Sequence, residues 1–182
     1  MHKTAQIKYL AIGLACLLGV GVYAPGLQGS FALDDYTNVV QNPAIAIQSL
    51  SWDSLSHAAF SFQAGPTMRP LSMLSFALNA YFTGVDAAGP FKATNLAIHL
   101  INGLLVFWLL SQILKAYRKA FAPDLEATRL QWLALSAGAI WLLHPLNAMP
   151  VLYVVQRETA LSSRMGRLVS RQVRRTAVSP PP

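Results

Sequence analysis

The sequence predicts an all-α membrane protein with about three spans, and two observations carry that expectation. Hydrophobic residues make up 54% of the 182 residues and charged residues only 12%, about half the share in a soluble domain. Three long stretches contain no Asp, Glu, Lys or Arg: Tyr9–Leu33, Ala93–Leu114 and Leu130–Val155. Each can cross a bilayer as a helix of about 20 residues. This pattern excludes a soluble globular domain and a disordered chain.

The first apolar stretch predicts an uncleaved membrane anchor over residues 9–27. Lys3 and Lys8 precede it, as at the start of a signal peptide or of a first span whose N-terminus lies inside. Residues 22–24 resemble a small-residue cleavage site, so a cleaved signal peptide is the alternative. Pro25 would directly follow such a cut, and the uncharged stretch continues beyond the span. Both features favour the anchor.

Residues 28–92 predict a loop on the outer side of the membrane. Turn-forming Gly, Asn and Pro residues punctuate residues 28–69. This part contains three aspartates but Arg69 as its one base, and loops with few Lys or Arg belong outside. Residues 70–85 are uncharged but short for a span, and polar residues recur in them at helical spacing. We expect a helix lying at the membrane surface, or a re-entrant one.

Residues 93–114 and 130–153 predict the second and third spans. The loop between them is basic and marks the inner side; its bases are Lys115, Arg118, Lys119 and Arg129. Pro145 and Pro150 should bend the third span or end it early. The predicted topology has the N-terminus inside, three spans, and the chain from Gln156 onward outside.

Residues 164–182 predict a basic, proline-ending disordered tail. The net charge of the chain is +7, and five arginines without an acid lie in these last 19 residues. Their position after a span that ends outside conflicts with the positive-inside tendency. For a membrane protein this balance indicates lipid headgroups and topology signals as the partners of the positive charge, not nucleic acid.

Ionisable and amide groups lie in or beside the spans, where they are costly unless they face protein or water. Asn95, His99 and Asn102 share one face of the second span. Hydrogen bonding to a neighbouring helix is the alternative explanation for them. His144 lies in the outer half of the third span, about 21 Å along it. We expect these groups to gather near the outer surface: Asp34, Asp35, His99, His144 and Arg157.

Paired carboxylates beside histidines and an arginine suit one kind of chemistry. A carboxylate can take the proton of an attacking hydroxyl. Arginine and histidine can hold the phosphate of a leaving group. The pair Asp34 and Asp35 can also hold a divalent metal. By itself Asp-Asp is a weak motif, because two adjacent acids in a loop are usually solvated.

Four strings resemble, in order and spacing, the N-terminal part of a membrane enzyme family. The family is the GT-C glycosyltransferases similar to protein O-mannosyltransferases, in many of which tetratricopeptide repeats follow the membrane domain. The resemblance covers about residues 5–162. The strings are Phe31–Tyr36 with Asn38 and Asn42–Ile45, Arg69–Phe76, Asn95–Asn102, and Leu143–Leu146 with Tyr153–Arg157.

The resemblance implies transfer of a sugar, such as mannose, from a polyprenyl-phosphate carrier to a hydroxyl acceptor. The acceptor would be Ser or Thr of an exported protein, on the outer face of a bacterial inner membrane. Asp34 would be the general base, and Asp35 would assist it or bind a metal. The implied contacts to the carrier phosphate are Arg69, His99, His144 and Arg157.

The chain also departs from the family pattern near residue 163. The family continues through further apolar spans, whereas here Ser163 is followed by the basic tail. We therefore expect an incomplete GT-C-like domain over residues 1–163, cut short or shifted out of frame and inactive alone. The alternative is a small non-enzymatic membrane protein or assembly subunit. A transporter is less well supported, because no inverted repeat is visible.

Overall fold

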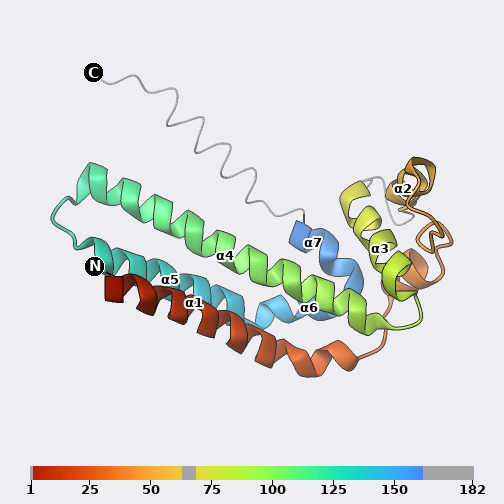
Figure 1. Ribbon diagram of the computed structural model, residues 1–182, viewed down its shortest axis with the longest axis horizontal. Helices are drawn as coiled ribbons and strands as arrows, with labels where there is room; N and C mark the ends of the chain where they lie inside the picture. Colours follow the sequence, from red (N-terminus) through yellow and green to blue (C-terminus); the bar gives the residue numbers. More distant parts are fainter. Residues whose placement is uncertain (1, 63–68, 162–182) are drawn as a thin grey trace, which may run out of the picture.

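The computed structural model describes residues 2–62 and 69–161, and the predicted tail, residues 164–182, lies outside them. Every regular element in the described residues is helical, and no strand occurs among them. The predicted all-α fold is therefore confirmed. Three long helices lie side by side, and a group of short helices covers one end of them (Figure 1).

The long helices are α1 (His2–Tyr23), α4 (Ala88–Phe121) and α5 (Ala127–Leu143). A 3-10 turn, Ala24–Gln28, extends α1. Two helical segments are long and apolar enough to cross a membrane, Gln6–Gln28 and Ala88–Phe121. These fit an integral membrane protein, as the first two predicted spans require.

The third predicted span is bent at Pro145. The helix α5 ends at Leu143, a 3-10 turn spans Pro145–Asn147, and α6 follows as Ala148–Leu152. The two parts meet at 51° and count as a third span only if taken together. Proline has no N–H for the helical ladder, and the His144 Nδ1 atom accepts the Leu146 N–H instead, at 3.2 Å. The predicted bend is confirmed.

Glycines allow the long helices to approach closely midway along the bundle. A Cβ atom on Gly138 of α5 would lie 3.2 Å from the Cβ of Phe107 in α4 and 3.5 Å from its Cα. One on Gly103 of α4 would lie 2.7 Å from a methyl of Leu142 in α5. Where helices cross in a membrane, such small residues let the backbones pack.

We expect Gly138→Leu to destabilise the bundle by about 2 kcal/mol, because the added side chain must push back the backbone of α4. The measurement is the free energy of unfolding in mixed micelles. Gly13→Leu is the matched control, since nothing lies within 4 Å of a Cβ there. Equal stability of the two variants would contradict the close α4–α5 contact.

The short helices α2 (Trp52–Ala59) and α3 (Pro70–Thr83) cover the end of the bundle where α4 begins (Figure 1). A buried core joins them to α4; its fully buried members include Val39, Ile45, Met73, Phe76 and Phe91. The predicted helix over residues 70–85 is thus observed as α3. Directly after it comes the capping residue Gly84, whose φ of 73° is readily adopted only by glycine.

The last described helix, α7 (Arg157–Leu161), packs against α3, α4 and α6. It returns the chain to the covered end of the bundle. Segments that lie far apart in the sequence therefore meet there: the loop after α1, the start of α4, and the stretch after α6.

Candidate functional site

The two adjacent aspartates lie on a tight turn after the first helical segment. Leu33, directly before them, has a φ of 42°, a left-handed conformation that costs a branched side chain about 1–3 kcal/mol. The Asp35 Oδ2 atom accepts the Ala32 N–H at 3.0 Å and closes this turn. A π-helical turn, Tyr36–Val40, follows. Asp34 is exposed, whereas Asp35 is fully buried.

The turn is fixed to a segment 120 residues further along the chain. The Asp35 Oδ1 atom accepts the Val155 N–H at 2.7 Å, and the Asp34 N–H donates to the Tyr153 hydroxyl at 3.1 Å. The predicted acidic pair is therefore in contact with the C-terminal end of the third predicted span. The buried acid holds the backbone, and the exposed one is held beside it.

Burial raises the pKa of the Asp35 carboxyl above its ordinary value, because the ionised form loses hydration. Two effects act in the opposite direction and lower the pKa: the hydrogen bonds that the carboxylate accepts from backbone N–H groups, and the positive charge of Lys92. Burial is the larger effect. Asp35 is thus a structural acid whose charge is costly, and the exposed Asp34 is the acid that a ligand can reach.

Lys92 is a buried cation that sequence reasoning missed as a site residue. Its Nζ donates to the carbonyl of Gly29 at 2.9 Å and reaches that of Gly26 at 3.5 Å. A Cβ on Gly29 would lie 2.8 Å from this Nζ, so glycine permits the approach. A lysine just before an uncharged span was the available signal. Lys92 ties the start of α4 to the loop after α1.

Arg157 is fully buried and surrounded by neutral groups. Its guanidinium donates to Asn95 Oδ1 at 2.6 Å, to the Phe91 carbonyl at 2.8 Å and to Ser75 Oγ at 3.1 Å. It also lies 4.5 Å from the centre of the Phe76 ring. Burial lowers the pKa of Arg157 to about 9, so it stays charged at neutral pH. Arg157 joins α7 to α3 and α4.

The polar face of α4 bonds to neighbouring segments. Asn95 Nδ2 donates to the Tyr153 carbonyl at 3.2 Å, and Asn102 Nδ2 donates to the Ala160 carbonyl at 3.1 Å. His99 is buried, with Nε2 2.8 Å from the Leu142 carbonyl oxygen. These contacts correspond to the alternative of hydrogen bonds between helices. His99 and Arg157 are enclosed by protein and do not face an open site.

Arg69 forms an ion pair with Glu158 and lies 4.9 Å above the Phe62 ring centre. Arg69 is 43% exposed, whereas Glu158 is 6% exposed and its Oε1 has no hydrogen-bond partner among the described residues. A cavity of about 250 Å³ opens beside the pair. Arg69 is therefore a predicted phosphate contact that a ligand can reach, as is the exposed His144, although Glu158 shares the charge of Arg69.

The six predicted site residues fall into separate groups. Asp34 and Asp35 meet Tyr153 and Val155, while Arg157 and His99 are buried in the frame of the helices. Within residues 2–62 and 69–161, no hydrogen bond or ion pair joins the acids to Arg69 or to the exposed His144. The acidic turn and the Arg69–Glu158 pair are thus two distinct features of the same covered end.

The acidic pair does not fit a metal site as it stands. Both oxygens of Asp35 accept backbone N–H groups, and the side chain is fully buried. No group of three or more His, Cys, Asp or Glu side chains in the described part of the chain is placed to hold a metal ion. Divalent cations need several oxygen ligands, so we derive no step through a metal.

Comparisons with known proteins identify no relative. No family model matches the chain, no curated protein matches it, and no solved structure matches it. A functional interpretation therefore depends on the residues at the covered end of the bundle and on the sequence strings that surround them.

Proposed function

We propose that the described helices form the N-terminal portion of a GT-C-like membrane glycosyltransferase. It would transfer a sugar, such as mannose, from a polyprenyl-phosphate carrier to a hydroxyl acceptor. One observation supports this most: the exposed carboxylate of Asp34 sits on a turn that the buried Asp35 fixes to the stretch after α6. The segments joined there, residues 31–36 and 153–157, are two of those that resemble the family.

In the proposed reaction Asp34 takes the proton of the acceptor hydroxyl. The acceptor oxygen forms a bond to the anomeric carbon of the sugar. The bond from that carbon to the phosphate oxygen breaks, and the polyprenyl phosphate leaves with the electron pair. Asp35 is a positioning residue, because both of its oxygens are engaged with the backbone. Arg69 is the accessible cation for the phosphate, and the buried His99 and Arg157 hold the frame.

The charges at the two ends of the bundle support an orientation. The end of the bundle at the α4–α5 loop is basic. It carries five bases and only two acids: the bases are Lys8, Lys115, Arg118, Lys119 and Arg129, and the acids are Asp124 and Glu126. Since basic loops stay inside, we propose that this end lies in the cytoplasm and the acidic turn outside, as in a bacterial inner membrane. An exported protein with free Ser or Thr hydroxyls would then be the acceptor.

We expect Asp34→Asn to lower sugar transfer at least a hundredfold in a complete enzyme that contains these helices, because an amide cannot accept the hydroxyl proton. The assay follows label from a short-chain polyprenyl-phosphate mannose into a Ser/Thr peptide, using membranes from cells that express the gene. Asp53→Asn is the matched control, since Asp53 is an exposed acid of the same predicted outer loop. It should leave transfer unchanged.

Full transfer by Asp34→Asn, at wild-type amounts in the membrane, would remove Asp34 from the reaction. Loss of transfer in both variants would point to a general charge requirement of the outer loop. Either result would contradict the assignment of the general base.

A non-enzymatic membrane protein or assembly subunit is the second candidate. It is favoured by a specific observation: within the fold, Asp35 and Arg157 have their polar side-chain atoms engaged, and so does His99 at Nε2. Under this alternative the assay above shows no transfer, even from a chain with a complete membrane domain. Asp34→Asn then changes neither its amount in the membrane nor its assembly with partners.

A further inference from the structure

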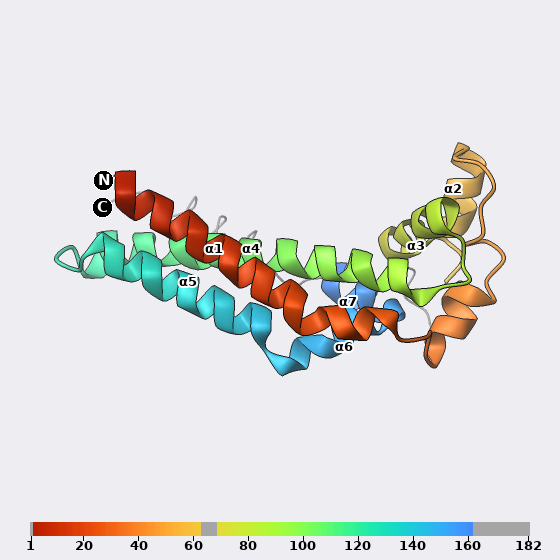
Figure 2. The same cartoon turned by 60° about the horizontal axis from the view of Figure 1, so that its bottom comes forward.

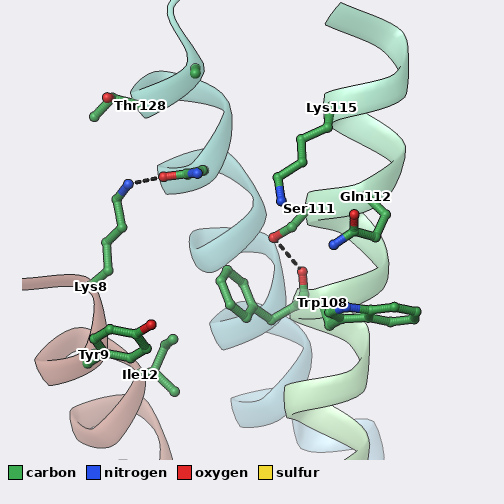
Figure 3. Close-up of a pocket in the computed structure, with 11 residues that line it drawn as sticks. Lys8, Tyr9, Ile12, Trp108, Ser111, Gln112, Lys115 and Thr128 are labelled. Atoms are coloured by element: carbon green, nitrogen blue, oxygen red, sulfur yellow. Dashed lines mark hydrogen bonds between the residues drawn. The ribbon is translucent and has the colours of Figure 1, made fainter. Parts of the chain in front are cut away.

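A large cavity lies at the end of the bundle away from the acidic turn. It has a volume of about 560 Å³ and lies between the N-terminal half of α1, the C-terminal half of α4 and the start of α5. Figure 3 shows Lys8 and Tyr9 on α1 facing Ser111 and Lys115 on α4 across this space. No residue named in the proposed sugar transfer lines it.

The cavity follows from the packing of the three long helices. Near the C-terminal ends of α1 and α5 the helices are close, since a Cβ on Gly19 would lie 3.3 Å from Leu100 and 3.5 Å from Leu142. The helix α1 crosses the α4–α5 pair at an angle (Figure 2). Closer to the N-terminus of α1, the larger side chains of Ile12 on α1 and Phe107 on α4 line the space between the helices. The cavity thus lies where α1 separates from the α4–α5 pair.

The rim of the cavity is positively charged. Lys8 donates a hydrogen bond to Gln131 Oε1 on α5. Lys115 has no hydrogen-bond or ion-pair partner in the part of the chain that the structure describes. No Asp or Glu is among the lining residues. An adjoining cavity of about 280 Å³ shares Lys115 and Gln131 and adds Arg118.

The other lining groups suit the boundary between lipid headgroups and acyl chains. Tyr9 and Trp108 lie at the cavity, and Trp108 is 52% exposed. Aromatic residues of this kind concentrate at membrane interfaces. Ile12 and Phe107 give the deeper part an apolar wall. A cationic rim above an apolar wall matches a molecule with an anionic head and a hydrocarbon tail.

We propose that this cavity binds the phosphodiester headgroup of an anionic membrane phospholipid, with Lys8 and Lys115 on the phosphate. Basic pockets between transmembrane helices recognise such headgroups. The hydroxyl of Ser111, which donates to the Phe107 carbonyl at 2.8 Å, lies on the same wall. The acyl chains follow the apolar wall of α1 and α4. This site is independent of the proposed sugar transfer at the other end.

The test is native mass spectrometry of the full chain in detergent, titrated with phosphatidylglycerol or with phosphatidylcholine. We expect phosphatidylglycerol to bind more tightly. Lys8→Gln and Lys115→Gln should each weaken that binding roughly fivefold, as is typical for one lysine near an anionic headgroup. Lys119→Gln removes the same charge one turn further along α4, away from the lining residues. It should leave binding unchanged.

Circular dichroism checks that all variants fold like the wild type. Lys115→Arg keeps the positive charge, so this variant should bind phosphatidylglycerol as tightly as the wild type. Equal binding of the two lipids would overturn the proposal. So would equal weakening by Lys119→Gln, which would indicate charge attraction without a site. Equal affinity for soluble glycerol phosphate would also overturn it, since the apolar wall would then contribute nothing.

Discussion

We expect Arg157→Ala to lower the free energy of unfolding by about 3 kcal/mol, a large loss for a single substitution. Arg157 is the largest fully buried side chain, so its removal leaves a cavity between α3, α4 and α7. The Asn95 Oδ1 and Phe91 carbonyl oxygens each lose a charged donor. The measurement is reversible unfolding by a harsh detergent in mixed micelles, followed by circular dichroism.

Two comparisons separate the causes. Arg157→Met keeps much of the volume and removes a buried charge that pairs with no acid among the described residues, so it should cost less than Arg157→Ala. Arg129→Ala is the control, because Arg129 is exposed and its ion pair with Glu126 lies at the surface. It should change stability by less than about 0.5 kcal/mol. A loss below about 1 kcal/mol for Arg157→Ala would contradict its structural role.

The spans were predictable because length and hydropathy decide them, but their ends were not. The helix α4 begins at Ala88, five residues before the predicted span, and continues to Phe121, seven residues beyond it. At the first end Lys92 lies inside the helix and bonds back to Gly29. At the second end the basic residues continue the helix, since lysine and arginine extend their charges towards water.

The bend at Pro145 was predictable from the missing N–H of proline, whereas α2 and the π-helical turn were not. Both lie in a stretch rich in turn residues, where local preferences compete. Their positions depend on the core around Ile45 and Phe76. That core forms only when the loop after α1 meets α3 and α4.

Spacing placed the polar residues near one end of the bundle but could not assign their partners. It grouped Asp35 with Asp34, although one is buried and the other exposed. It treated Arg157 as a ligand contact. In the structure the guanidinium of Arg157 donates hydrogen bonds to Asn95, Phe91 and Ser75. These hydrogen bonds join segments that are more than 60 residues apart in the sequence, so no local sequence pattern can predict them.

We expect Asp35→Ala to lower the free energy of unfolding by about 2 kcal/mol, because the buried Val155 N–H loses its acceptor. The Ala32 N–H also loses the bond that closes the turn. The loss should be local as well as global. Amide hydrogen exchange in residues 153–157 should become faster, since these amides depend on the contact with the turn. Unchanged exchange there would contradict the bond from Val155 to Asp35.

The pH dependence of the free energy of unfolding separates the effect of the Asp35 charge from the effect of the side chain's shape. Because burial raises the pKa of Asp35 in the folded state, the folded chain binds a proton more readily than the unfolded chain. This contribution to stability is therefore present at low pH and is lost as pH rises from the ordinary aspartate value through the raised one. Asp35→Asn keeps the shape without a titrating group, so its stability should lack this fall. If wild type and Asp35→Asn kept a constant difference over that range, Asp35 would titrate alike in both states. The cost of its buried charge would then be negligible, and the strained turn at Leu33 would be held by its hydrogen bonds alone.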